Sequence, residues 1–109
     1  MMDKLWAELV KSGGRCEYCG KKERLNAHHF YSRSNHSVRW DIKNGFALCP
    51  YHHCLGNWSA HKNPAEFVEW AIEKRGKSWY ESLRKEKNRV LKRSEWERVY
   101  GELRKLSKE

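Results

Sequence analysis

Cysteine and histidine side chains recur in this sequence at a fixed short spacing. Two residues separate Cys16 from Cys19, two separate Cys49 from His52, and 29 residues lie between the two pairs. A gap of two residues lets one tight turn present both side chains to the same ion, and Zn²⁺ is held by four Cys or His ligands in a tetrahedron. The four residues therefore predict a structural zinc site. Cys54 is the alternative to His52, because its thiolate is the softer ligand although its gap from Cys49 is four residues.

A second group of imidazoles could take part in a reaction. His28 and His29 are adjacent in a short segment with apolar residues on both sides, and His53 directly follows the second pair of zinc ligands. Successive side chains of a strand point to opposite faces, so one imidazole can bind a cation while its neighbour faces a water molecule. A neutral imidazole, whose ordinary pKa is about 6.5, can deprotonate water near pH 7. An activated water and a cation together suit hydrolysis of a phosphodiester, in which charge builds on the phosphate oxygens.

Hydrophobic spacing and helix caps predict the elements that position these side chains. Pro50 suits the first turn of a short helix that carries His53. Asn63, followed by Pro, is typical of a cap at a helix start, and Ser-x-x-Glu capping boxes begin at Ser78 and Ser94. We predict helices over residues 3–11, about 50–55, 64–75, 79–93 and 95–107, a tight turn over 15–26, and strands over 25–31 and 45–48 joined by a polar loop.

Length and composition favour a single small domain. Residues 1–109 are enough for one hydrophobic core and too few for two independent ones. No apolar run approaches the roughly 18 residues needed to cross a bilayer, and the first four residues lack the apolar core of a signal peptide. We therefore expect a soluble, cytoplasmic protein that binds no membrane. Thiols stay reduced in that compartment, which favours metal ligation over two disulfides for the four Cys residues.

Positive charge is concentrated toward the end of the sequence. The formal net charge is +9, of which residues 1–73 contribute +2 (ten Lys and Arg, eight Asp and Glu) and residues 74–109 contribute +7 (thirteen and six). Because Lys and Arg contacts to phosphates supply most non-specific affinity for nucleic acids, a polyanion is the expected partner. The alternative is a solvated helical surface, since Glu residues interleave with the basic ones as they do in surface helix pairs.

The order of these residues resembles the HNH (ββα-metal) endonuclease family, in particular its small phage-encoded members with a structural zinc. Cys-x-x-Cys is followed by His-His, then by Asn44, and then by Leu-Cys-x-x-His-His, all within residues 13–61. Fourteen residues separate His29 from Asn44, which fits the family pattern. The resemblance implies that His28 and His53 bind a catalytic divalent metal. It also implies that His29 is the general base and that Asn44 braces the loop between the two strands.

The resemblance also bears on the choice of metal. His52 stands where family members usually have Cys, and His28 stands where many have Asp. Mg²⁺ prefers oxygen ligands, whereas two imidazoles suit Mn²⁺, Ni²⁺, Co²⁺ or Zn²⁺ better, and all five ions are candidates for the catalytic position. His61 is a further candidate ligand of this ion, with a structural role before the helix cap as the alternative.

Together these inferences predict an α+β fold. It consists of a zinc-stapled ββα-metal core over residues 13–61, an N-terminal helix, and a basic helical extension over residues 64–107. The expected function is metal-dependent hydrolysis of DNA phosphodiester bonds, with duplex DNA contacted mainly through its phosphates. For a phage-encoded chain the site of action would be the host cytoplasm, and packaging or recombination proteins would be partners. The alternatives are a non-catalytic zinc module that binds nucleic acid, and an adaptor that docks on an acidic protein.

Overall fold

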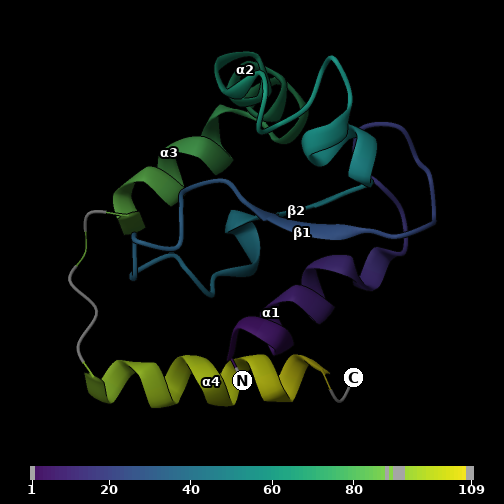
Figure 1. The fold of residues 1–109 in the computed structure, drawn as a ribbon. Helices are drawn as coiled ribbons and strands as arrows, with labels where there is room; N and C mark the ends of the chain where they lie inside the picture. Colours follow the sequence, from purple (N-terminus) through teal and green to yellow (C-terminus); the bar gives the residue numbers. More distant parts are fainter. Residues whose placement is uncertain (1, 88, 90–92, 108–109) are drawn as a thin grey trace.

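The computed structural model describes residues 2–87, 89 and 93–107, without the side chains of residues 93, 94 and 107 (Figure 1). Within this part of the chain the fold is α+β, with two antiparallel strands and several helices, as predicted. In chain order the elements are α1 (Met2–Val10), η1 (Lys11–Gly13), β1 (Asn26–His29), η2 (Ile42–Asn44), β2 (Gly45–Leu48), η3 (Tyr51–Leu55), α2 (Pro64–Arg75), α3 (Lys77–Lys87) and α4 (Arg93–Ser107).

The two strands form a short hairpin, and Gly45 is the position where helix α1 approaches it. The register places His28 opposite Phe46 and His29 opposite Gly45. A Cβ atom at Gly45 would lie 2.8 Å from the Trp6 ring, closer than real Cβ atoms approach a neighbour. Glycine therefore lets α1 pack directly against β2, which brings the Trp6 indole over the end of the hairpin.

Strand β1 is shorter than the predicted strand over residues 25–31. It ends at His29 because the next two residues bond to Asn44 instead of extending the hairpin ladder. The Phe30 N–H donates to the Asn44 backbone carbonyl at 2.8 Å, and the Tyr31 N–H donates to Asn44 Oδ1 at 2.7 Å. Asn44 thus accepts hydrogen bonds from both residues that follow β1.

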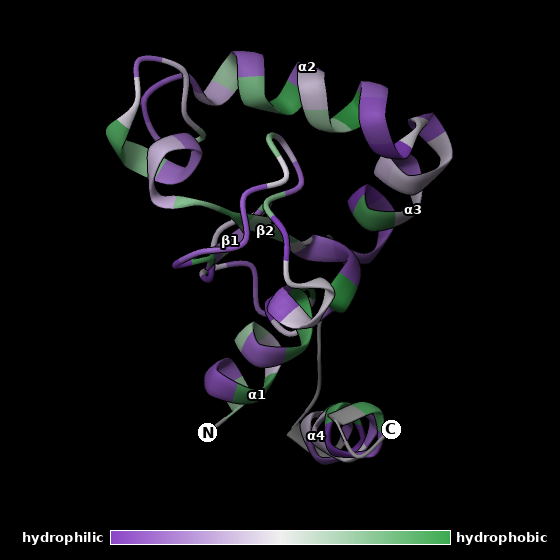
Figure 2. Cartoon of the chain, turned by 90° about the vertical axis from the view of Figure 1, so that its right-hand side faces the viewer, coloured by the Kyte–Doolittle hydropathy of each residue, from purple (hydrophilic) through white to green (hydrophobic). Residues whose placement is uncertain are grey.

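Each face of the hairpin carries its own core cluster, and all four residues of β2 are buried. On one face α2 covers a cluster that comprises Cys16, Phe46, Leu48, Cys49, Ala60, Phe67 and Ala71. On the other face α1 and α4 close over a smaller cluster of Trp6, Trp40 and Leu103. Figures 1 and 2 show α2 and α4 at opposite ends of the molecule with the strands between them. Helix α4 therefore contributes to the core instead of forming a detached tail.

Two predicted helix caps are wrong. Asn63 precedes α2, but its side-chain Oδ1 accepts a hydrogen bond from the Ser59 backbone N–H at 3.0 Å instead of capping the helix. Ser78 lies inside α3 because Gly76 already separates α2 from α3, with a φ of +97° that favours glycine. The capping box predicted at Ser94 depends on a side chain outside the described residues.

Helix α3 ends at Lys87, and residues 88 and 90–92 of the helix predicted over 79–93 lie outside the described part of the chain. Among the described residues, no helix combines the length and the apolar character needed to span a membrane.

Candidate metal centre and active site

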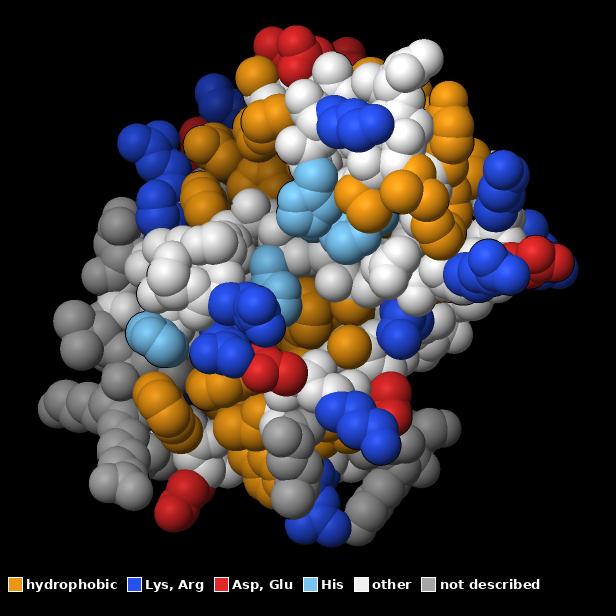
Figure 3. Space-filling model, viewed as in Figure 1, with side chains coloured by type: hydrophobic (Ala, Val, Ile, Leu, Met, Phe, Trp, Pro, Cys, Tyr) orange, Lys and Arg blue, Asp and Glu red, His pale blue; other side chains and the backbone are white. Residues whose placement is uncertain are grey.

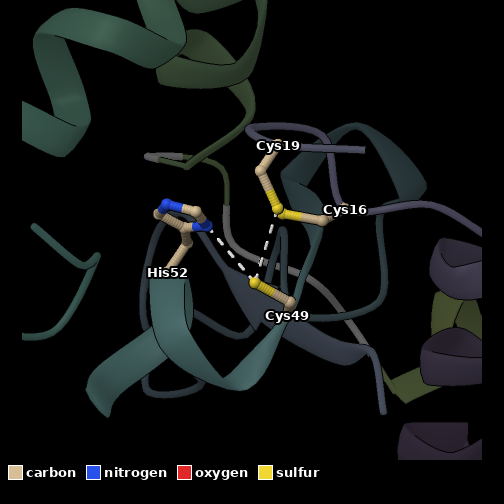
Figure 4. Close-up of side chains that lie close together, drawn as sticks. All are labelled: Cys16, Cys19, Cys49 and His52. Carbon is tan, nitrogen blue, oxygen red and sulfur yellow. Dashed lines mark hydrogen bonds between the residues drawn. The ribbon is translucent and has the colours of Figure 1, made fainter. Parts of the chain in front are cut away.

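Four ligand atoms from three segments converge beside the end of β2 (Figure 4). Cys16 and Cys19 lie on the turn after η1, Cys49 follows β2, and His52 lies on η3. All four atoms, three sulfurs and one imidazole nitrogen, lie within 4.8 Å of one another. The sulfurs of Cys19 and Cys49 are 3.7 Å apart, which agrees with the spacing of about 3.8 Å expected for two sulfurs bound tetrahedrally at about 2.3 Å from one Zn²⁺. The four residues are close enough to hold a metal ion, which suggests a structural zinc.

The backbone around Cys16 stabilises its thiolate. Burial acts to raise the pKa of the Cys16 thiol, but hydrogen bonds from backbone N–H groups outweigh burial and lower the pKa below its ordinary value. These groups belong to Cys49, Cys19 and Tyr18. The turn is closed by the Gly20 N–H, which donates to the Cys16 carbonyl at 2.9 Å, and Gly20 has the positive φ of +81° that this turn requires. Because the thiolate is the form that binds zinc, the turn prepares Cys16 as a ligand.

His52, and not Cys54, lies with the three other ligands. His52 Nδ1 is 3.2 Å from Cys49 Sγ, whereas Cys54 is exposed and is not part of the cluster. The two residues lie on η3, a single wide turn in which the Gly56 N–H donates to the Tyr51 carbonyl at 2.7 Å. Residues two positions apart on such a turn point to different sides, so only one of them can face the cluster.

A second group of residues that could hold a metal ion consists of three histidines, His28, His53 and His61. One ring nitrogen of each lies within 4.8 Å of the others. The Nε2 atoms of His53 and His61 are 3.0 Å apart, and the His28 ring centroid lies 5.2 Å from that of His53 and 5.1 Å from that of His61. Three imidazoles that converge in this way can hold one divalent cation.

The backbone after η3 explains how His61 reaches His53. The Ala60 N–H donates to the His52 carbonyl at 2.9 Å, and the His61 N–H donates to the His53 carbonyl at 3.1 Å. The segment therefore folds back along the helical turn and places residues eight positions apart side by side. His28 reaches the same point from β1.

Both of the less exposed histidines in this group are held in the neutral form. Burial, together with the neighbouring His53 and His61, lowers the pKa of His28 to about 3. Burial also lowers the pKa of His53, with a further contribution from His61. At neutral pH these imidazoles therefore carry a free lone pair, which is what a cation requires of them.

The next residue of β1, His29, points to the opposite face of the hairpin. Its ring stacks on the Trp6 indole, with centroids 3.9 Å apart and planes 11° from parallel. Its Nε2 lies 3.0 Å from the Arg39 carbonyl oxygen. Because a carbonyl only accepts, Nε2 carries the proton, and the free lone pair of the neutral ring is on Nδ1. Burial lowers the pKa of His29 below its ordinary value, which favours this neutral form near pH 7.

Asn44 is fully buried and holds the chain that directly follows His29. Its side chain makes two hydrogen bonds to Tyr31: Oδ1 accepts from the backbone N–H at 2.7 Å, and Nδ2 donates to the carbonyl at 3.0 Å. These bonds fix the loop between β1 and β2 at the point where the ladder of the hairpin ends. The predicted brace therefore holds Tyr31, which lies two residues after His29.

His28, His29, His53 and His61 line one surface pocket of about 620 Å³. Figure 3 shows histidine side chains gathered around a hollow at the centre of this face, with Lys and Arg side chains at its margin. The walls come from α1, β1 and the start of α2, and Arg33 also lines the pocket. The converging imidazoles and His29 therefore share one solvent space, although they point to different faces of β1.

The sequence predicted the ligands better than it predicted their surroundings. The four predicted zinc ligands lie together, and so do the three histidines predicted as candidates for the second ion. Asp3, Trp6 and Arg39, which surround His29, were not predicted as a group. The contacts that Asp3 and Trp6 make with this group join residues at least 23 positions apart, as from Trp6 to His29, and no local spacing predicts such contacts.

Comparison of the chain with protein-family models, with curated proteins and with solved structures finds no match. The Cys/His cluster and the small α+β fold are compatible with the HNH family. What the geometry shows is an α+β chain with a Cys/His cluster close enough to hold a metal ion, beside a pocket lined by further histidines.

Proposed function

We propose that this protein is a metal-dependent DNA endonuclease of the HNH (ββα-metal) type, which hydrolyses phosphodiester bonds. The observation that carries the proposal is the shared pocket. Three imidazoles converge on one side of β1, and a neutral His29 held through Nε2 lies on the other side. Phosphodiester hydrolysis needs these two components, a cation site for the charge on the phosphate and a base for the attacking water.

The catalytic cation would be held by His28, His53 and His61. Three imidazole nitrogens suit Mn²⁺, Co²⁺, Ni²⁺ or Zn²⁺ better than Mg²⁺, which prefers oxygen ligands. When bound, the cation supplies positive charge to the scissile phosphate and to the leaving oxygen. Three protein ligands are the number typical of catalytic sites, which keep a position for the substrate.

His29 would act as the general base. In the neutral ring, Nδ1 accepts a proton from the attacking water while the Nε2–H remains bonded to the Arg39 carbonyl. That carbonyl also stabilises the imidazolium that forms, because both ring nitrogens are then donors. General-base catalysis of this kind contributes about 10²–10⁴-fold to the rate. Asn44 supports the base indirectly by fixing the chain that follows it.

The Cys/His cluster would hold a structural zinc. An ion bound by Cys16, Cys19, Cys49 and His52 joins the turn after η1 to the end of β2 and to η3. A domain with so short a sheet gains much of its stability from such an ion. Because His52 and His53 are adjacent on η3, the structural zinc would also hold one ligand of the catalytic cation in place.

Duplex DNA is the proposed substrate, contacted mainly through its phosphates. The chain carries a net charge of +9, and Lys and Arg side chains lie at the margin of the hollow in Figure 3. Arg33 lines the pocket itself and would reach a phosphate bound there. Contacts of this kind provide affinity that does not depend on base sequence and that falls with salt.

A non-catalytic zinc module that binds nucleic acid is the second candidate. The Cys/His cluster and the positive charge favour it equally. It would have no use for a neutral histidine held in a fixed orientation beside a second group of metal ligands. The two candidates therefore differ in what they predict for His29.

The test is nicking of supercoiled plasmid by the zinc-loaded protein, with Mn²⁺, Co²⁺, Ni²⁺ and Mg²⁺ added in turn. We expect the wild-type protein to cleave, and His29→Ala to cleave at least about 100-fold more slowly while it keeps its zinc and its DNA affinity. His36→Ala is the matched control, because His36 is exposed and does not line the pocket. If the wild-type protein binds DNA but cleaves it with none of these ions, the non-catalytic module is favoured instead.

A further inference from the structure

Helix α1 contacts the loop that holds His29 through the carboxylate of Asp3. Asp3 Oδ1 accepts from the Arg39 Nε–H at 3.0 Å, and Oδ2 accepts from Arg39 Nη2–H at 2.6 Å. The same Oδ1 accepts from the Trp40 indole N–H at 2.9 Å. One carboxylate therefore fixes two consecutive side chains of the loop, and the backbone carbonyl of the first, Arg39, is the acceptor of the His29 Nε2–H.

Trp6, one turn further along α1, makes the next contacts. Its indole N–H donates to the Asp41 carbonyl at 2.8 Å, and its ring stacks on His29 with a centroid distance of 3.9 Å. Trp6 is only 1% exposed and packs in the cluster that includes Leu103 of α4. Three consecutive loop residues are thus bound by α1, which is itself supported by the C-terminal helix.

We propose that Asp3 and Trp6 are positioning residues for the general base, and that α1 acts as a clamp on the orientation of the His29 ring. The effect of this clamp on catalysis rests on the proposed function. Trp6 fixes the plane of the His29 ring by stacking. Asp3 forms an ion pair with Arg39 and so fixes the Arg39 carbonyl, which accepts the His29 Nε2–H. The lone pair on His29 Nδ1 therefore points in one fixed direction. A displacement of a catalytic group by about 1 Å can cost about 100-fold in rate, so such a clamp has a measurable effect.

The alternative is that Asp3 serves only to stabilise the fold. The Asp3 side chain is 46% exposed and that of Arg39 is 23% exposed, and ion pairs open to solvent add little to global stability. Asp3→Asn is therefore expected to fold and to bind zinc as the wild type does. Trp6 is a poorer test, because its ring fills the core and its removal would mix positioning with stability.

The test combines NMR of the histidine rings with cleavage kinetics on the full-length, zinc-loaded protein. In ¹⁵N-histidine-labelled Asp3→Asn we expect the His29 Nε2–H to exchange with water about tenfold faster than in the wild type, because the carbonyl that accepts it is less firmly held. We expect kcat for plasmid cleavage to fall about tenfold with KM unchanged. Arg39→Gln breaks the same ion pair from the other side and should accelerate exchange equally. Asp3→Glu keeps the carboxylate and should recover part of kcat.

Glu8→Gln is the matched control, because it removes a carboxylate from an exposed position of the same helix. It should leave both the Nε2–H exchange and kcat at their wild-type values. Exchange at the wild-type rate in both Asp3→Asn and Arg39→Gln would overturn the clamp, whatever the cleavage rates. If both variants exchange faster but the wild-type protein cleaves no DNA, the clamp stands and the proposed function fails instead.

Discussion

The Cys/His cluster and the histidine cluster share the turn η3 but offer an ion different surroundings. The first has four ligands, of which Cys16 and Cys49 are buried, whereas the second has three ligands, of which His61 is exposed. Only the second opens into the pocket of about 620 Å³. Four protein ligands close the coordination sphere of zinc, whereas three leave room for a substrate. Under the proposed function, adjacent residues of one short turn would bind a structural ion on one side and a catalytic ion on the other.

The largest expected effect follows loss of the ion held by the Cys/His cluster. In Cys49→Ser we expect the protein to lose its zinc and its cooperative thermal transition, because structural zinc contributes on the order of 10 kcal/mol to the folding of small domains. Metal analysis and a melting curve followed by circular dichroism measure both. Cys54→Ser is the control, since Cys54 is exposed and outside the cluster, and it should match the wild type. Retention of the zinc by Cys49→Ser would remove the basis for the structural role.

A substitution in the histidine cluster should reduce cleavage and leave the zinc of the Cys/His cluster in place. In His53→Ala we expect metal-dependent cleavage to fall by about 100-fold or more, because the catalytic cation loses one of its three ligands, while the zinc content stays at the wild-type value. Plasmid nicking at a fixed Mn²⁺ concentration and metal analysis of the same sample provide the measurement. If His53→Ala loses its zinc together with its activity, the two clusters are not independent and the comparison fails.

Acid should act on the histidine cluster through His28. The pKa of His28 is about 3 in the folded protein and about 6.5 in an unfolded chain, so the unfolded state binds the proton more readily. The stability that neutral His28 contributes is therefore complete above about pH 6.5 and is lost as the pH falls toward 3. We expect urea unfolding of the wild type to lose more stability between pH 7 and pH 5 than that of His28→Gln. The zinc ligands are the same in both proteins, so an equal loss would contradict this role of His28.

The smallest expected effect is at the margin of the pocket. Arg33→Gln should weaken DNA binding by a few-fold and reduce the slope of log affinity against log salt by about one, because one phosphate contact is lost. Arg15→Gln is the matched control, since Arg15 is exposed and does not line the pocket. Titrations of labelled duplex DNA at several salt concentrations measure both slopes. Equal slopes for the two variants would show that the pocket does not face the DNA.

The two clusters also differ in how far the sequence could predict them. Each half of the Cys/His cluster is a local motif, because two residues between ligands are enough for one turn to present both side chains. His61 has no such signal. It reaches His53 only because the His61 N–H and the Ala60 N–H bond back to the carbonyls of η3. Backbone pairing of this kind follows from how a loop folds, and the spacing of the residues does not reveal it.

The fold shows the same limit. The strands and the starts of α1 and α2 were predicted within a few residues, because apolar spacing and Pro64 are local signals. The cap predicted at Asn63 is wrong because its side chain bonds to the preceding loop. The contact of Asp3 with Arg39 joins positions 36 residues apart, and it depends on the packing of α1 against the hairpin. Such contacts depend on the tertiary structure, and local sequence patterns do not predict them.

The most direct test of two separate metal sites is a paired measurement of metal content and plasmid cleavage during mild chelation. We expect an intermediate that retains one zinc per chain and no longer cleaves, and we expect Mn²⁺ or Co²⁺ to restore its cleavage without displacing that zinc. Undiminished cleavage by protein that holds only the zinc of the Cys/His cluster would contradict the division between the two sites. Failure of every added ion to restore cleavage would contradict it equally.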